Sequence, residues 1–133
     1  MTRLQQELER LLKQICTIEA SEALVLLGQP DVCFVDLRDG HELDAYGKIP
    51  GAEHCPRGSL EFRIPPDSDY HHDFFTQNKR FVFYCSHGQR SILATNTAMQ
   101  LGLQNVCHIK GGMIAWGKAG GAVEKLGADA HEE

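Results

Sequence analysis

Three short apolar runs separated by helix-type segments constrain the fold of this chain most strongly. The runs are VCFVDLR at 32–38, RFVFYC at 80–85 and NVCHIK at 105–110. Continuous apolar runs of this length are typical of strands that are buried on both faces, as in parallel sheets. The segment SILATNTAMQLGL at 91–103 has helical apolar spacing and lies between the last two runs. We therefore expect an α/β domain with a mainly parallel sheet.

Weaker patterns fill in the order of elements. A short extended piece at 16–18 precedes a helix over about 20–27, which Gly28 and Pro30 end. We also expect a short helix at 41–46, a short strand within 47–56, a helical turn at 58–62, a short helix within 69–77 and a glycine turn into a short helix within 111–120. The predicted organisation is an amphipathic helix at 1–15, one domain at 16–123 and a polar, frayed tail at 124–133.

The N-terminal helix carries an apolar stripe whose partner the sequence leaves open. Thr2 and Gln5 have the spacing of a capping box at its start. The apolar positions, at helical spacing, are Leu4, Leu8, Leu11, Leu12 and Ile15. This stripe could cover the domain's own sheet, or it could pair with a second copy of the protein as a homodimer.

Charge and cysteine content exclude several classes of protein. The net charge of -5 argues against general nucleic-acid binding, which needs a basic face, although a local basic pocket remains possible. No apolar run is long enough to span a bilayer and no secretory leader is recognisable, so we expect no membrane partner and a cytoplasmic location. The five cysteines are odd in number and widely spaced, which makes a disulfide framework unfavourable. Four of them are expected to be small buried hydrophobes: Cys16, Cys33, Cys55 and Cys107.

The fifth cysteine lies in the stretch YCSHGQRS, between a predicted strand and a predicted helix. Ligands of parallel sheets bind outside the carboxyl ends of the strands, where Cys85 falls. A following helix N-terminus favours a thiolate, a glycine permits a sharp turn, and an arginine offers donors to an oxyanion. A strand-end cysteine before a glycine turn can also be simple topology. The functional interpretation is a nucleophilic Cys85 with an anion-binding loop of Ser86, His87, Gly88, Gln89 and Arg90.

Four stretches occur in order along the chain: VDLRDGHELDAYGKIPGAEHCP, RFVFYCSHGQRS, AMQLGLQNVCHIKGG and GGMIAWGKAGGAV. Through them the chain resembles, from about Thr17 to Val123, the rhodanese (sulfurtransferase) family in its single-domain form. It implies a five-stranded, mostly parallel sheet with helices on both faces, to which this chain adds its N-terminal helix. It also implies that Cys85 becomes a persulfide. The chain departs from the family pattern at Lys48, Cys55 and Gly117, outside the Cys85 loop.

The function that the resemblance implies is ping-pong sulfur transfer. A small anionic donor such as thiosulfate would give its outer sulfur to Cys85, and cyanide, a thiol or a protein acceptor would remove it. No cofactor is implied. Cysteine phosphatases and arsenate reductases share the thiolate and arginine, but their loop has five residues between the two. Here four residues separate Cys85 from Arg90, which favours a single sulfur over phosphate or arsenate. A non-catalytic binding domain is the other alternative, and the intact Cys85 argues against it.

Several charged residues are candidates for the rim of the site. Asp36 and Arg38 end a strand, and a structural ion pair of Arg38 with Glu42 is the favoured interpretation over a catalytic role. Arg57 and Arg63 are expected at the mouth of the pocket, where they would influence the choice of donor. His87 is expected as a solvent-facing side chain and Trp116 as a core residue. We expect no metal site, because the cysteines and histidines lack the paired spacing that metal ligands need.

Overall fold

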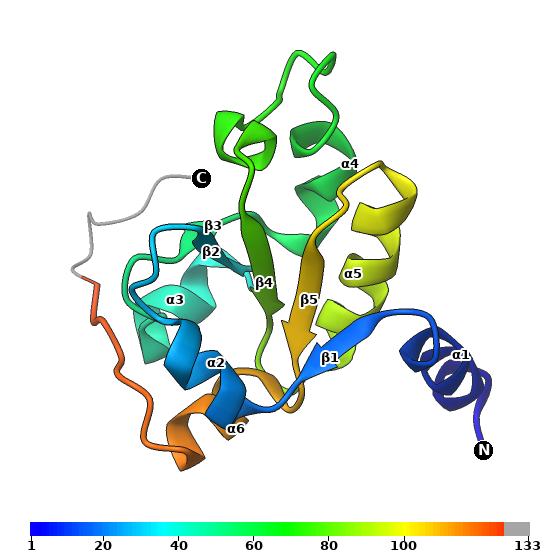
Figure 1. Ribbon diagram of the computed structural model, residues 1–133. Coiled ribbons are helices and arrows are strands. Elements are labelled where there is room, and N and C mark those ends of the chain that lie inside the picture. Colours follow the sequence, from blue (N-terminus) through cyan, green and yellow to red (C-terminus); the bar gives the residue numbers. More distant parts are fainter. Residues whose placement is uncertain (127–133) are drawn as a thin grey trace.

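Five parallel strands form a single sheet in the computed structural model, which describes residues 1–126 (Figure 1). The elements are α1 (Arg3–Leu12), β1 (Cys16–Ile18), α2 (Ala20–Leu26), β2 (Val32–Asp36), α3 (Gly40–Tyr46), β3 (Glu53–His54), α4 (Leu60–Arg63), β4 (Arg80–Tyr84), α5 (Gln89–Gln100), β5 (Val106–Ile109) and α6 (Gly112–Lys118), with 3-10 turns at Arg57–Ser59 and Asp73–Thr76. The strand order is β1-β5-β4-β2-β3, and each neighbouring pair is parallel. The predicted α/β class with a five-stranded parallel sheet is therefore confirmed.

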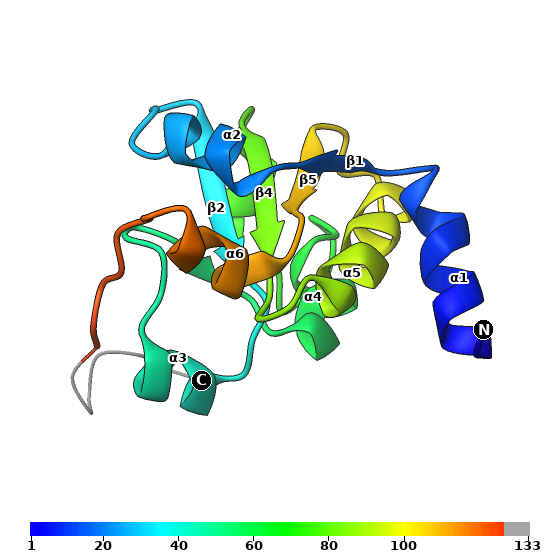
Figure 2. The same cartoon turned by 90° about the horizontal axis from the view of Figure 1, so that it is seen from below.

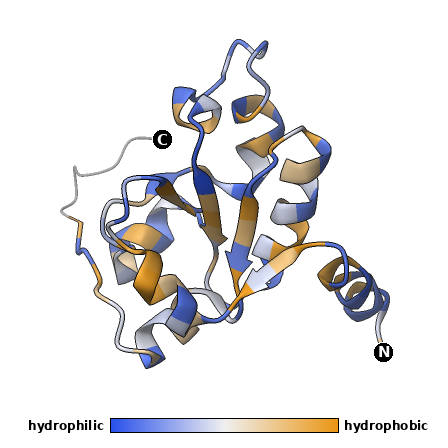
Figure 3. Ribbon diagram, viewed as in Figure 1, coloured by the Kyte–Doolittle hydropathy of each residue, from blue (hydrophilic) through white to orange (hydrophobic). Residues whose placement is uncertain are grey.

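Alternating side chains of the central strands point to two separate hydrophobic layers. Phe81 and Phe83 of β4 belong to the layer that also contains Leu60 of α4 and Ala94 of α5. Val82 and Tyr84 belong to the opposite layer, with residues of α2 and α6. Helices thus cover both faces of the sheet, as Figures 1 and 2 show. Figure 3 shows hydrophobic residues along β4 and β5, and these residues are buried between the two helix layers.

The N-terminal helix packs against its own domain. Leu8 and Leu11 of α1 contact Ile92 of α5 in a small buried cluster. The predicted capping box is present, since the Thr2 hydroxyl accepts a hydrogen bond from Gln5 N at 3.1 Å and the Gln5 side chain accepts one from Thr2 N. Leu4 remains 52% exposed. The buried part of the stripe therefore covers the chain itself, and a homodimer through the exposed part stays a prediction.

Some boundaries differ from the predictions. Helix α5 covers Gln89–Gln100 instead of 91–103, because Gly88 at φ +94° starts it and Gly102 at φ +97° follows its end. Glu124, which the sequence places in a frayed tail, forms an antiparallel bridge with Lys48. The rest of that predicted tail from 127 on lies outside the described residues.

The cysteines also divide differently from the prediction. Cys33, Cys55 and Cys107 are buried, and burial raises the pKa of their thiols to about 11, 12 and 11. Cys16 is exposed, so the prediction of burial is wrong there, because β1 is an edge strand of the sheet.

Within residues 1–126, each helix is too short or too polar to cross a membrane.

Candidate active site

Cys85 lies directly after β4 at the carboxyl edge of the sheet, where parallel sheets bind ligands. The residue is only 1% exposed. Its Sγ accepts a hydrogen bond from the backbone N–H of Gly88 at 3.2 Å. Helix α5 begins at the next residue, Gln89, so the unpaired N–H groups of its first turn lie close to the sulfur in sequence. The loop thus directs a backbone donor to Cys85 Sγ at the start of a helix.

The glycine pair Gly111-Gly112 packs directly against the loop. A Cβ atom on Gly112 would lie 2.3 Å from the carbonyl oxygen of Cys85, and a Cβ on Gly88 would lie 2.8 Å from Gly111 N. The first turn of α6 then binds the loop, since Met113 N donates to Cys85 O at 2.8 Å and Ile114 N donates to Ser86 O at 3.2 Å. The glycine pair therefore lets a second helix fix the backbone of Cys85.

Arg90 is bound by a carboxylate that the sequence did not single out for the loop. Its guanidinium donates to both oxygens of Glu42 at 2.9 and 3.0 Å. The Ser86 hydroxyl donates to the same carboxylate at 3.0 Å. Hydrogen bonding from Arg90 lowers the pKa of Glu42 to about 2, so this carboxylate is ionised at neutral pH. The Asp39-x-x-Glu42 capping-box spacing is the sequence signal that locates Glu42 at the start of α3.

Asp36 and Arg38 form a buried structural pair. The Arg38 guanidinium donates to Asp36 at 2.7 and 3.0 Å and to the carbonyl oxygen of Gly47 at 2.6 Å. Both side chains are almost fully buried. The predicted structural role is thus seen, but the predicted partner of Arg38, Glu42, is wrong. Asp36 is two residues away on the same strand end, whereas Glu42 is already bound to Arg90.

A chain of hydrogen bonds connects the loop to the edge of the sheet. The Ser91 hydroxyl donates to Gly88 O at 3.2 Å and therefore accepts from Nδ1–H of His108, 2.9 Å away. Burial lowers the pKa of His108 to about 4, so the ring is neutral and its Nε2 accepts from the Thr17 hydroxyl at 2.9 Å. Sequence reasoning missed Ser91 and His108 as supports of the loop, because their contact depends on α5 packing against β5.

A cavity of about 510 Å³ lies beside the loop. Its lining residues are Arg38, Glu42, Tyr46, Ser86, His87, Arg90, Met113 and Ile114. We call it the loop cavity. His87 is exposed, in agreement with the predicted solvent-facing position, and Gln89 is exposed as well. The loop cavity brings together Arg38 and three of the five predicted loop residues.

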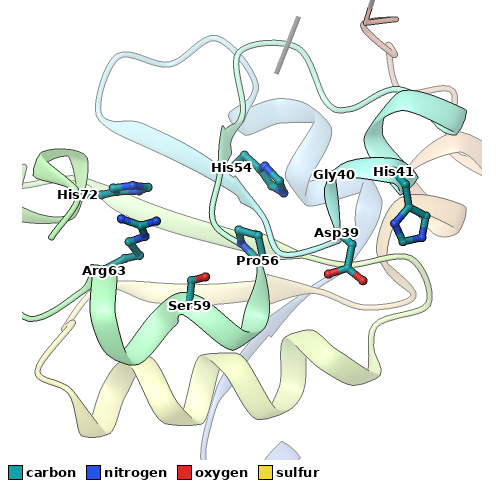
Figure 4. Close-up of a pocket in the computed structure, with 8 residues that line it drawn as sticks. All are labelled: Asp39, Gly40, His41, His54, Pro56, Ser59, Arg63 and His72. Carbon is teal, nitrogen blue, oxygen red and sulfur yellow. The ribbon is translucent and has the colours of Figure 1, made fainter. Parts of the chain in front are cut away.

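Two of the predicted rim residues lie elsewhere. Arg63 lines a second cavity of about 590 Å³, shared with Asp39, Gly40, His41, His54, Pro56, Ser59 and His72 (Figure 4). Arg57 donates to Thr97 at 3.2 Å and pairs with Glu61 at 3.5 Å. In the part of the chain that the structure describes, neither Arg57 nor Arg63 lines the loop cavity, so their predicted position at its mouth is wrong. The same part of the chain contains no group of three or more Cys, His, Asp or Glu residues that could hold a metal ion.

The family model for the rhodanese-like domain matches residues 19–119, which include every strand from β2 to β5 and the whole Cys85 loop. The chain belongs to the rhodanese-like family. Among solved structures, this rhodanese-like chain is similar to a protein of unknown function from Rhodopseudomonas palustris CGA009, described as a possible tyrosine phosphatase. The two are 45% identical with a TM-score of 0.88, over 93% of this chain and 96% of that one.

Two further comparisons reach less far. Thiosulfate sulfurtransferase from Pseudomonas aeruginosa is 22% identical with a TM-score of 0.69, over 84% of this chain and 19% of that one, which supports the rhodanese fold alone. The tRNA uridine(34) hydroxylase of Cronobacter sakazakii is 28% identical over 101 residues. That match covers 76% of this rhodanese-like chain but only 28% of the hydroxylase, so the chain spans little more than a quarter of its curated relatives' length.

Proposed function

We propose that this rhodanese-like domain is a sulfurtransferase that carries sulfur as a persulfide on Cys85. The observation that supports this most directly is the Gly88 N–H bond to Cys85 Sγ, inside a loop with only four residues between Cys85 and Arg90. So short a loop encloses a small anionic group, such as the outer sulfur of a persulfide. The backbone of Cys85 is also fixed by Met113, which would keep the sulfur in place through both halves of a reaction cycle.

The proposed cycle has two displacements at sulfur. The Cys85 thiolate attacks the outer sulfur of a donor such as thiosulfate, the S–S bond of the donor breaks, and sulfite leaves with the bonding electron pair. An acceptor then attacks the outer sulfur of the Cys85 persulfide. Cyanide becomes thiocyanate, or a thiolate becomes a new persulfide, and the Cys85 thiolate is regenerated. Backbone N–H groups of the loop and the N-terminus of α5 would stabilise the anionic sulfur in each state.

Other functions suggested by the relatives have less support. The Rhodopseudomonas palustris protein is described as a possible tyrosine phosphatase. In this chain the loop is one residue shorter than the C-x5-R loop of cysteine phosphatases, and Arg90 already holds a carboxylate. The tRNA hydroxylases are about three to four times longer than the matched segment, and a net charge of -5 disfavours RNA binding. We therefore propose neither activity for this chain.

A thiocyanate assay separates these functions. The protein is given thiosulfate and cyanide, and thiocyanate is measured for the native chain, Cys85→Ser and the control Cys107→Ser, whose cysteine is buried in the sheet core. We expect Cys85→Ser to lose all turnover above background and Cys107→Ser to keep it. Turnover that survives in Cys85→Ser would contradict the proposal. Hydrolysis of para-nitrophenyl phosphate by the native chain, without any thiocyanate, would favour the phosphatase instead.

A further inference from the structure

The cations that line the loop cavity are both neutralised. Arg90 is held by Glu42 through two hydrogen bonds, and Arg38 is held by the buried Asp36. The formal charges of these four side chains cancel. Thiosulfate is a dianion, and a chain of net charge -5 repels it at long range. Among the described residues that line it, the cavity therefore offers a charged donor no arginine or lysine without a carboxylate partner. Its remaining donors include the Tyr46 hydroxyl, the Arg90 N–H groups that do not bind Glu42, the exposed His87 and backbone N–H groups.

The outer part of the same cavity is apolar. Tyr46 at the end of α3 is 66% exposed, and Ile114 in the first turn of α6 is 44% exposed. Met113 lies beside Ile114 and is partly buried against the core. Exposed apolar side chains that gather around one cavity are typical of a surface that contacts a ligand. The volume of about 510 Å³ is also far larger than one sulfur atom requires.

The positions of Tyr46, Met113 and Ile114 are fixed relative to the Cys85 loop. Met113 N and Ile114 N donate hydrogen bonds to the carbonyl oxygens of Cys85 and Ser86. The backbone that carries the two side chains is therefore bound directly to the loop. Glu42 binds Ser86 and Arg90, and it belongs to the helix that ends at Tyr46. The two apolar walls and the loop are thus parts of one connected unit. Because Ser86, His87 and Arg90 of the loop also line the cavity, a substrate in the cavity lies next to the loop that carries Cys85.

We propose that the Cys85 site exchanges sulfur with uncharged organic thiols and their persulfides, in preference to the thiosulfate dianion. This inference rests on the proposed sulfur transfer. In the loading step the Cys85 thiolate attacks the outer sulfur of R–S–S–H, the donor S–S bond breaks, and R–S⁻ leaves with the electron pair while the proton stays on the outer sulfur. In the discharging step a thiolate R–S⁻ attacks that outer sulfur, R–S–S–H forms, and the Cys85 thiolate is released. Tyr46, Met113 and Ile114 contact the apolar group R.

The discharging step gives a direct test with matched probes. The protein is loaded with a persulfide, excess donor is removed, and loss of the extra sulfur is followed by intact mass spectrometry. Benzyl mercaptan is compared with mercaptoacetate and 2-mercaptoethanesulfonate, and each rate is divided by the rate of the same thiolate with a small free persulfide. We expect the benzyl thiol to discharge the protein about tenfold faster than either anionic thiol on this corrected scale. Equal corrected rates, or faster anionic thiols, would overturn the inference.

A charge at the apolar wall should reverse this preference. Ile114→Lys places a free cation there, so anionic thiols should become faster and the benzyl thiol slower, whereas Ile114→Leu should keep the native order. Val25→Lys is the control, because Val25 is 71% exposed and lines a different cavity. An unchanged preference in Ile114→Lys would contradict the inference. If no donor loads a persulfide on the native chain, the proposed function itself fails, which is a separate and recognisable outcome.

Discussion

Replacing Gly112 by alanine should damage sulfur transfer far more than it damages folding. A Cβ atom at this position would lie 2.3 Å from Cys85 O and 2.8 Å from Ser86 O, and Cβ atoms essentially never approach other atoms closer than 3.0 Å. The carbonyl group of Cys85 would therefore have to move by about 0.7 Å. This movement would also strain the hydrogen bond from Met113 N, which is 2.8 Å long.

The magnitudes follow from geometry. Gly112 has a φ of +59°, and an alanine in this left-handed region costs about 1–2 kcal/mol of stability. Displacing a reacting group by about 1 Å typically lowers turnover about a hundredfold. We therefore expect a free energy of unfolding lower by about 1–3 kcal/mol and a transfer rate lower by about one to two orders of magnitude.

The assay combines urea unfolding with the rate of thiocyanate formation. Gly102→Ala is the matched control, because Gly102 has a φ of +97° but no atom within 4 Å of its added Cβ. It should lose about 1–2 kcal/mol of stability and keep its transfer rate within about twofold. Gly117→Ala, at a helical glycine with open space, should raise the free energy of unfolding by about 0.5–1 kcal/mol and leave the transfer rate unchanged. A transfer rate of Gly112→Ala within about threefold of Gly102→Ala would refute the idea that α6 positions Cys85.

Three further predictions concern titration and reactivity. Because Arg90 lowers the pKa of Glu42 to about 2, the ionised Glu42 stabilises the fold above pH 4.5. This contribution is lost as the pH falls from about 4.5 to about 2. In Glu42→Gln, the free energy of unfolding measured in urea should therefore change less with pH over that range. Burial lowers the pKa of His108 to about 4, so this histidine is protonated in the unfolded chain before it is protonated in the folded one. The free energy of unfolding should therefore fall as the pH drops from 6.5 to 4, by up to about 1.4 kcal/mol per pH unit. His108→Gln should reduce this dependence on pH. Burial raises the pKa of Cys55 and Cys107, so iodoacetamide at pH 7.5 should leave both unlabelled in the native protein and label both in urea, as peptide mass spectrometry would measure.

The features that could be predicted from the sequence are those that depend on local patterns. The runs at 32–38 and 80–85 are buried on both faces and therefore read as strands without ambiguity. Cys85, Gly88 and Arg90 are close in sequence, so their loop could be predicted from one segment. The capping box at Thr2 is local in the same way.

The features that could not be predicted depend on contacts between distant segments. Glu42 meets Arg90 only because α3 lies against the loop after β4, 48 residues later in the chain. Thr17, Ser91 and His108 meet because β1, β5 and α5 are neighbours in space. No local pattern distinguishes the choice of Arg38 between Asp36 and Glu42. The charge state of the loop cavity, and with it the proposed substrate class, was therefore accessible only from the structure.

Peptide mapping of the native chain after treatment with a sulfur donor tests the proposed sulfur transfer most directly. The native chain is treated with a sulfane-sulfur donor, freed of excess donor and mapped by peptide mass spectrometry without reduction. We predict one added sulfur atom on the peptide that contains Cys85, its removal by cyanide or a thiol, and no added sulfur on Cys33, Cys55 or Cys107. An added sulfur on those buried cysteines with none on Cys85, or an unmodified Cys85 with every donor tried, would contradict the account.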